Sequence, residues 1–247
     1  MENGLLDRSE RLLGPHGMQQ IASKRIILFG VGGVGSWCAE CLVRSGIMHL
    51  TIVDNDDVCP TNCNRQLMAT TRTIGQVKVE AMRKRLLDVN PEADITAIKA
   101  TYSAESAASL SLDTYDYIID AIDSLKDKCH LILQATQLAH VNHHIRFYSS
   151  MGAALRIDPT KIQVAEFWNV KGDALARAIR NTFKKSKTFP ASKFKCVYSE
   201  ETPLPNLGTT TETSTYKAQI NGSMCPVTGI FGMTLAGLVI QDITTNH

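Results

Sequence analysis

A glycine-rich turn at residues 30–35, which reads GVGGVG, constrains the fold of this chain more than any other feature. It follows a short apolar segment, residues 25–30, and precedes residues 34–45, whose apolar side chains recur at helical spacing. A G-x-G-x-x-G turn between a strand and a helix is typical of nucleotide-binding α/β domains, because glycine lets the backbone approach a phosphate at the helix start. The alternative is that these glycines serve only close packing of helix on strand. They are Gly30, Gly32, Gly33 and Gly35.

Strand and helix patterns alternate along the rest of the chain. We expect strands at residues 50–53, 94–100, 115–122 and 143–149, and helices at residues 77–89 and 124–139. This order predicts an α/β fold with a doubly wound, mostly parallel, Rossmann-like sheet. Further on we expect a strand at 161–167, a helix at 173–182, a long surface loop at 188–215 and a buried helix at 226–240.

The composition is that of a folded, soluble protein. Apolar residues make up 44% of the 247 residues and charged residues 20%. The chain opens on polar residues without a secretory leader, so we expect reduced cysteines and a cytoplasmic location. The apolar segment 226–240 is shorter than the roughly 20 residues that cross a bilayer, and we therefore predict no membrane span.

Polar and cationic residues follow the second expected strand. Asp54 ends that strand, 19 residues after the last glycine of the turn, where a carboxylate can accept a hydrogen bond from a ribose. Downstream, Arg65 and Lys78 are suited to hold a triphosphate and the charge of departing pyrophosphate. The alternative is that both are solvated surface charges. Two neutral donors lie nearby, Asn62 and Gln66.

Two aspartates close the expected strand 115–122. Asp120 and Asp123 fall at the carboxyl edge of the sheet, where open α/β folds bind ligands, and one of them could hold Mg²⁺. The alternative role for Asp123 is to cap the helix that begins near Ser124.

Taken together, these motifs resemble the ubiquitin-activating-type adenylyltransferases. The shared pattern comprises GVGGVG, DNDDV at 54–58, N-x-N-R-Q at 62–66, GQVK at 75–78, Asn90-Pro91 and D-x-x-D at 120–123. The resemblance implies an adenylation fold with a nucleotide-binding core at residues 8–150, and ATP and Mg²⁺ as cofactors. It implies nucleotide contacts from Gly30, Gly32, Gly33, Gly35, Asp54, Asp56, Asn62, Gln66 and Lys78. It further implies catalytic roles for Arg65, Lys78 and Asp123, of which Asp123 also handles the metal. A fourth catalytic residue, Arg8, is implied to come from the partner subunit of a homodimer.

The cysteines bear on the branch of this family. Sulfur-carrier activators hold a structural zinc with two C-x-x-C pairs. Cys38 and Cys41 come nearest to this pattern but are expected to face inward on a helix, and Cys59 and Cys63 have the wrong spacing. We therefore predict no structural zinc.

The second part of the chain indicates a branch. Residues 151–164, 196–199 and 222–224 resemble the tRNA threonylcarbamoyladenosine dehydratases, which extends the likeness to nearly the whole chain. This implies a single adenylation domain, 1–247, in which 151–247 form a tRNA-binding extension and a closing helix. The implied reaction adenylates the carboxylate of a modified adenosine beside the anticodon, after which the group cyclises. A sulfur-transfer partner is a further candidate.

A cationic strip supports an RNA partner. Between residues 177 and 195 there are no acids, and the aromatic residues Phe183, Phe189 and Phe194 are interspersed among seven cations. Such a strip suits phosphate contact and base stacking, although a solvated helix face would show the same charges. The cations are Arg177, Arg180, Lys184, Lys185, Lys187, Lys193 and Lys195.

Three other functions compete with this interpretation. A dehydrogenase that uses NAD would share the glycine turn and Asp54 but would have no use for Arg65, Gln66 and Lys78. A binding module for tRNA or protein would keep the fold without catalysis. Within the adenylating enzymes, the alternative substrate is the C-terminal glycine of a ubiquitin-like or sulfur-carrier protein.

Overall fold

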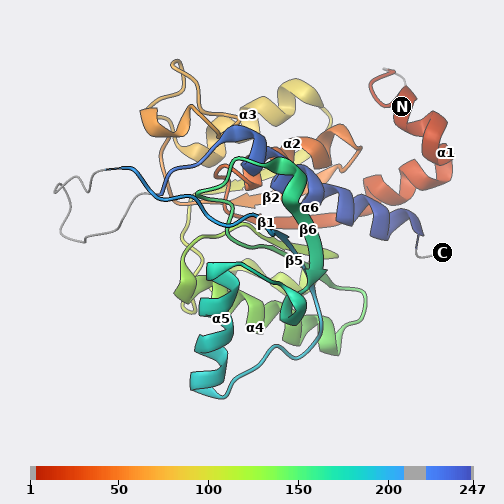
Figure 1. Ribbon diagram of the computed structural model, residues 1–247. Coiled ribbons are helices and arrows are strands. Elements are labelled where there is room, and N and C mark those ends of the chain that lie inside the picture. Colours follow the sequence, from red (N-terminus) through yellow and green to blue (C-terminus); the bar gives the residue numbers. More distant parts are fainter. Residues whose placement is uncertain (1–3, 209–220, 246–247) are drawn as a thin grey trace.

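A seven-stranded sheet with the order β3-β2-β1-β4-β5-β7-β6 lies at the centre of the computed structural model, which describes residues 4–208 and 221–245 (Figure 1). Neighbouring strands are parallel except for the edge pair β6 and β7, which is antiparallel. The strands are β1 (Arg25–Phe29), β2 (His49–Val53), β3 (Asp94–Ile98), β4 (Tyr117–Asp120), β5 (Arg146–Ser150), β6 (Ile162–Glu166) and β7 (Lys195–Ser199). The predicted doubly wound, mostly parallel α/β fold is confirmed.

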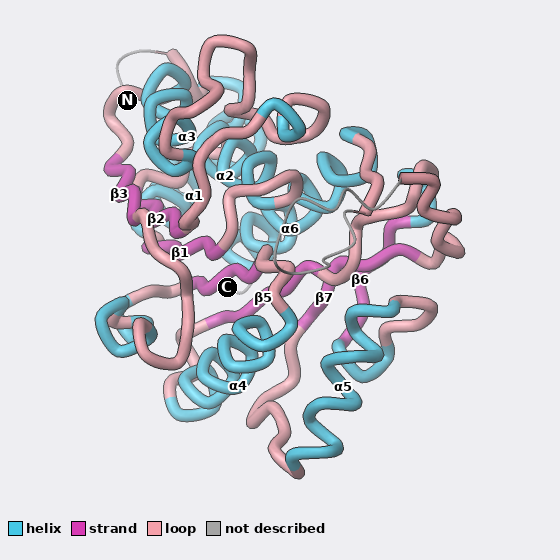
Figure 2. The backbone as a smooth tube through the Cα atoms, turned by 90° about the vertical axis from the view of Figure 1, so that its left-hand side faces the viewer, coloured by secondary structure: helices cyan, strands magenta, loops and turns pink. Residues whose placement is uncertain are grey.

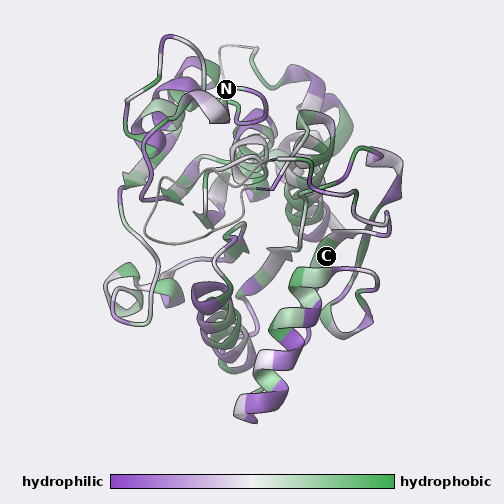
Figure 3. Ribbon diagram, turned by 60° about the vertical axis from the view of Figure 1, so that its left-hand side comes forward, coloured by the Kyte–Doolittle hydropathy of each residue, from purple (hydrophilic) through white to green (hydrophobic). Residues whose placement is uncertain are grey.

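Helices cover both faces of the sheet (Figure 2). On one face lie α1 (Asp7–Ser23, kinked at Gly14), α2 (Gly35–Arg44), α3 (Lys78–Val89) and α6 (Cys225–Thr245), and on the other α4 (Leu125–Val141) and α5 (Ala174–Ser186). Hydrophobic and hydrophilic residues alternate along most of the helices (Figure 3), and in α5 the buried residues Ala176, Ile179 and Phe183 recur at helical spacing. In β1, Ile26 and Leu28 belong to one apolar layer, and Ile27 and Phe29 to the other. A strand buried on both faces therefore needs the continuous apolar run that the sequence shows.

The expected surface loop at 188–215 is wrong in its centre, because Lys195–Ser199 forms strand β7. This strand inserts between β5 and β6, and the side chains of Cys196 and Val197 are fully buried. The five-residue strand lies among Ser, Thr and Pro residues and gains its burial only from partners far away in sequence. Residues 209–215 of the expected loop lie outside the described residues. The sequence pattern also gave no indication of α1.

Helix α6 is longer than the expected segment 226–240. It has 21 residues and is, in the described part of the chain, the one helix long and apolar enough to cross a membrane. Its side chains Val227, Phe231, Leu235 and Val239 are fully buried against the sheet layer and α2. These contacts are those of a core helix. At one side of the molecule, α6 also lies beside α1 (Figure 1).

The contact between α6 and α2 depends on Gly232. A Cβ there would overlap the carbonyl oxygen of Val34 and lie 2.8 Å from the Cβ of Trp37. We expect Gly232→Ala to lower the free energy of unfolding by about 1–3 kcal/mol, since the backbones must separate. Urea unfolding would measure this change. The matched control is Gly237→Ala in the same helix, where a Cβ meets nothing within 4 Å and no loss is expected.

Candidate functional site

A cavity of about 800 Å³ opens at the carboxyl ends of the strands. Its walls are the glycine turn after β1, the loop after β2, the turn after β4 and residues 150–156 after β5. The strand order reverses between β1 and β4, and open α/β sheets bind ligands at such a switch point. The cavity therefore occupies the place where the sequence predicts a nucleotide.

The glycine turn combines packing with an open wall. Gly30 has φ 85°, and a Cβ there would lie 2.6 Å from the carbonyl oxygen of Ala121, while a Cβ on Gly35 would overlap the carbonyl oxygen of Gly30. Packing alone thus requires glycine at these two positions. Gly30, Gly32 and Gly33 line the cavity, whereas Gly35 does not. The turn accordingly leaves backbone exposed to a ligand at the start of α2, as phosphate binding needs.

Asp54 ties the end of β2 to the glycine turn. One carboxylate oxygen accepts the Val31 N–H at 2.7 Å, and the other accepts the Asp56 N–H at 2.9 Å. The side chain is 11% exposed and lines the cavity. Oδ2 accepts only the Val31 N–H and keeps a further lone pair, so the carboxylate is fixed in place and can still accept a hydrogen bond from a ligand.

Lys78 is a buried cation at the start of α3. Its side chain is 3% exposed, so the alternative of a solvated surface charge is wrong for this residue. Its Nζ lies 2.8 Å from Oδ2 of Asp56 and 3.5 Å from Oδ1 of Asp54. Because the Asp56 side chain is 71% exposed, it can turn away when a phosphate takes its place beside Lys78.

Arg65 lines the cavity beside the glycine turn, where a Cβ on Gly33 would lie 3.2 Å from its Cγ, and is half-buried. Its Nη1 donates to the Thr61 carbonyl oxygen and to Oδ1 of Asn64, each at 2.9 Å. Among the described residues no carboxylate pairs with this guanidinium. The charge of Arg65 is therefore available to an anionic ligand.

The two amides expected near the phosphates, Asn62 and Gln66, also line the cavity. Oδ1 of Asn62 accepts the Cys59 N–H at 2.9 Å, which leaves its amide nitrogen for a ligand. Gln66 is buried, and its Oε1 has no hydrogen-bond partner.

The structure separates the two aspartates after β4. Asp120 is fully buried, and its carboxylate accepts from Lys128 Nζ at 2.8 Å, Ser149 Oγ at 2.7 Å and Ile122 N–H at 3.0 Å. With its oxygens so occupied, Asp120 is poorly suited to hold a metal, so Asp123 is the better candidate of the two. Asp123 is exposed on the cavity wall. It does not cap α4 either, since the N-cap residue is Ser124.

The buried pair of Asp120 and Lys128 has a structural role that can be tested. Lys128 Nζ also donates to the Ile122 carbonyl oxygen at 2.9 Å, so the pair fixes the turn that carries Asp123. We expect Asp120→Asn to cost about 3–5 kcal/mol of stability, because it leaves a buried ammonium without its counter-charge. Thermal or urea unfolding would show this loss. An Asp120→Asn protein of unchanged stability would contradict the assignment.

The far end of the cavity contains two residues to which sequence reasoning gave no role. Asp173 is buried, accepts the Gly152 N–H at 3.0 Å and caps α5 through the Ala176 N–H at 2.8 Å. Buried Arg156 pairs with it at 3.3 Å and donates to the Ser199 carbonyl oxygen. Burial lowers the pKa of the Arg156 guanidinium, while Asp173 and Glu201 oppose that shift. Arg156 belongs to the segment 151–164, which the sequence marks only as a whole, whereas no sequence signal points to a role for Asp173 at the site.

The described residues contain no group of three His, Cys, Asp or Glu side chains placed to hold a metal. Cys38 is buried on α2 and Cys41 is half-buried, while Cys59 and Cys63 are exposed in the loop after β2. Burial raises the pKa of the Cys38 thiol.

The predicted cationic strip needs correction in three places. The rings of Phe183 and Phe194 are buried in the core, so only Phe189 is exposed. Arg180 is half-buried and donates to the carbonyl oxygens of Phe167 and Val170, at 3.0 Å each. The other six cations of the strip are exposed: Arg177, Lys184, Lys185, Lys187, Lys193 and Lys195. Arg8 is exposed on α1 and does not line the cavity of its own chain.

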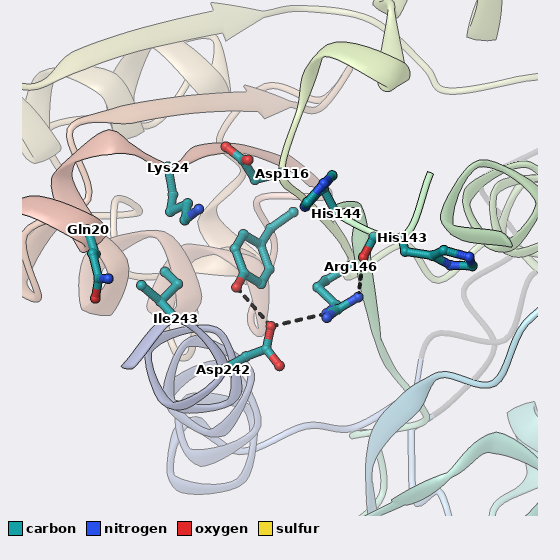
Figure 4. Close-up of a pocket in the computed structure, with 9 residues that line it drawn as sticks. Gln20, Lys24, Asp116, His143, His144, Arg146, Asp242 and Ile243 are labelled. Atoms are coloured by element: carbon teal, nitrogen blue, oxygen red, sulfur yellow. Dashed lines mark hydrogen bonds and ion pairs between the residues drawn. The ribbon is translucent and has the colours of Figure 1, made fainter. Parts of the chain in front are cut away.

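A second cavity, of about 190 Å³, lies at the opposite ends of the strands, beside the first residues of β4 and β5 (Figure 4). There the Asp242 carboxylate of α6 accepts the Tyr117 hydroxyl at 2.9 Å and Arg146 Nε at 3.3 Å. These bonds join α6 to β4 and β5. The arrangement is a structural joint and carries none of the predicted site residues.

Comparisons with known proteins identify the family of this chain. The ThiF family model matches residues 6–247. The tRNA threonylcarbamoyladenosine dehydratase of Bacillus subtilis is 33% identical, with 96% of this chain and 93% of that protein covered. The Haemophilus influenzae protein of that name is 35% identical over 94% of this chain and 90% of its own length. Molybdopterin-synthase adenylyltransferase of Escherichia coli, at 31% identity, matches over only 44% of this chain.

Among solved structures, the Escherichia coli tRNA N6-threonylcarbamoyladenosine dehydratase in complex with ATP matches with a TM-score of 0.82 and 32% identity, covering 96% of this chain and 93% of that one. The resemblance that the sequence motifs indicated is confirmed. The chain therefore belongs to the ThiF family, and the two curated relatives described above, which match 94% or more of it, are tRNA threonylcarbamoyladenosine dehydratases.

Proposed function

We propose that this protein is an ATP-dependent tRNA threonylcarbamoyladenosine dehydratase. The observation that carries this proposal is the cavity at the switch point, with a glycine turn, a buried lysine and an arginine that pairs with no carboxylate among the described residues. It occurs in a chain that matches named dehydratases over nearly its full length. A dehydrogenase would leave Lys78 and Arg65 without a task. The carrier-protein activators match less than half of the chain, which favours the tRNA substrate over the C-terminus of a carrier protein.

The proposed reaction activates a carboxylate that is otherwise unreactive. The carboxylate of the threonylcarbamoyl group attacks the α-phosphorus of ATP, a new O–P bond forms, and pyrophosphate leaves. A neighbouring atom of the same side chain then attacks the acyl carbon, loses its proton and closes a five-membered ring as AMP leaves with the carboxylate oxygen. The net change is loss of one water from the nucleoside. Such intramolecular attack is fast enough, with effective molarities up to roughly 10⁵–10⁸ M, that no enzyme nucleophile is needed.

The nucleotide would bind along the glycine turn. Gly32 and Gly33 present backbone to the phosphates, and Asp54 accepts from the ribose. Lys78 and Arg65 oppose the charge that develops on the departing pyrophosphate. Asp56 would move away from Lys78 as phosphate enters, while Asn62 and Gln66 add neutral contacts.

Asp123 fits a magnesium site completed by the nucleotide. Its carboxylate is exposed on the cavity wall, and Mg²⁺ is commonly held by one or two carboxylates together with substrate phosphates. When bound there, Mg²⁺ would neutralise charge on the pyrophosphate.

The proposal includes a homodimer and a substrate extension. Arg8 is exposed away from its own cavity, which suits a contact with the phosphates of a partner subunit. Residues 151–247 would bind tRNA within the single adenylation domain formed by 1–247, chiefly through the six exposed cations of the strip. A cytoplasmic location follows from these substrates, and a sulfur-transfer protein remains a candidate partner.

Exchange of labelled pyrophosphate into ATP tests this function. We expect exchange to depend on tRNA that carries threonylcarbamoyladenosine, and the tRNA to lose one water. Exchange that depends instead on a small carrier protein would replace the proposed function by carrier activation. NAD, which a dehydrogenase would need, should not raise the melting temperature, whereas ATP should.

A further inference from the structure

Two aromatic side chains, Trp168 and Phe189, lie side by side on the outer surface. Their ring centroids are 6.2 Å apart, with 47° between the ring planes. Trp168 is 41% exposed and Phe189 is 54% exposed. Exposed aromatic rings that lie next to one another offer flat apolar faces on which a planar group can stack.

The turn that carries Trp168 is held rigid from both ends. It is the single helical turn Phe167–Asn169, and Glu166 accepts the Trp168 N–H at 3.0 Å. Arg180 reaches from α5 and donates to the carbonyl oxygens of Phe167 and Val170, on either side of the tryptophan. Arg180, expected from the sequence to touch RNA, thus positions the tryptophan.

Phe189 is fixed in a similar way. The residue after it is Pro190, which restricts the backbone of Phe189. The Ala191 N–H donates to Thr136 Oγ1 at 3.2 Å, and the Ser192 hydroxyl donates to the Thr136 carbonyl oxygen at 3.1 Å, which anchors the segment to α4. Both rings are therefore presented on preformed backbone, which lowers the entropy cost of binding a flat partner.

The charge around the rings indicates the kind of partner. Residues 174–199 contain no acid, and six exposed cations of the strip lie on α5 and on the segment after it. Helix α5 begins at the cavity, which Ala174 and Leu175 line, and its 13 residues extend about 20 Å towards Phe189. A polyanion that enters the cavity can therefore follow α5 to the rings. An anionic partner with flat apolar faces is a single-stranded nucleic acid.

We propose that Trp168 and Phe189 form a stacking platform for an unpaired nucleobase of the RNA substrate, some 20 Å from the adenylation cavity, with the α5 cations on the flanking phosphates. This inference rests on the proposed function and adds to it the surface that selects looped RNA.

Binding of RNA to leucine variants tests the platform. The probes are a labelled tRNA anticodon stem-loop and the same stem closed as a continuous duplex. Trp168→Leu keeps apolar bulk and removes the ring, so we expect affinity for the stem-loop to fall about fivefold or more, with little change for the duplex. The slope of log affinity against log salt should stay the same, because no phosphate contact is lost.

Two further variants separate stacking from charge and from folding. Trp168→Phe keeps a ring and should retain most of the affinity. Lys184→Ala should weaken binding of both probes and reduce the salt slope by about 0.7–0.9. Equal stem-loop affinity of Trp168→Leu and wild type would overturn the platform, as would an equal loss for the duplex, which would indicate contact with the backbone only.

The platform and the proposed function can fail separately. If the wild-type protein binds the stem-loop and Trp168→Leu binds it equally well, only the platform is lost. If the wild-type protein binds neither probe while ATP still raises its melting temperature, the tRNA substrate is wrong and the platform falls with it.

Discussion

We expect Arg65→Ala to lower the rate of pyrophosphate release at least about a hundredfold, because the variant loses a cation that opposes charge on the leaving group. Arg65 is suited to this role since no described carboxylate pairs with it and its Nη1 is held by neutral oxygens of Thr61 and Asn64. The interaction strengthens as charge builds in the transition state, so kcat should fall more than the Michaelis constant for ATP rises. The measurement is ATP–pyrophosphate exchange with modified tRNA.

Arg65→Lys is the matched control for this loss. It keeps the charge but not the planar fork, so an intermediate rate is expected. The fold should survive in both variants, because the half-buried side chain makes only local bonds and the Arg65 carbonyl oxygen still accepts Trp37 Nε1 at 3.1 Å. An Arg65→Ala enzyme that works at nearly the wild-type rate would remove the proposed role for this cation.

The core of the fold could be predicted because its signals are local. Strands β1 and β4 are buried on both faces and appear in the sequence as continuous apolar runs. The glycine turn is typical of a connection between a strand and a helix. Strand β7 has no such signal. It is buried because β5 and β6 flank it, and that pairing is a property of the assembled sheet.

The site could be predicted by residue type but not by orientation. Asp120 ends strand β4 and Asp123 follows three residues later, and the sequence does not indicate which of the two faces the cavity. Lys128, from the following helix, makes the distinction by pairing with Asp120. Tertiary contacts of this kind assign one carboxylate to the core and leave the other for a ligand.

The burial of Phe183 is indicated by the helical spacing of apolar residues along the cationic strip. Ala176, Ile179 and Phe183 recur at helical spacing and form the buried side of α5, which places Phe183 in the core. No pattern along the chain links Phe189 to Trp168, because the two rings come from segments on either side of that helix.

Asp123→Ala should abolish pyrophosphate release at millimolar Mg²⁺ if its carboxylate holds the metal against the triphosphate. The residue is exposed on the cavity wall, next to a turn that the buried pair of Asp120 and Lys128 keeps in place. The variant should therefore fold normally. A raised Mg²⁺ concentration should restore part of the rate, since the nucleotide phosphates still bind the ion and only one ligand is missing.

The Mg²⁺ titration separates this role from a general loss of charge. Asp113→Asn removes an exposed carboxylate outside the cavity and should leave the Mg²⁺ dependence of the wild type unchanged. Asp123→Asn keeps the shape but offers a weaker, neutral oxygen, so it should need more Mg²⁺ than wild type and less than Asp123→Ala. The Mg²⁺ titration curves of wild type, Asp123→Asn and Asp123→Ala should thus be ordered by the strength of the ligand at position 123. If Asp123→Ala follows the wild-type curve in both rate and midpoint, the metal is held elsewhere, and the exposed position of Asp123 has another cause.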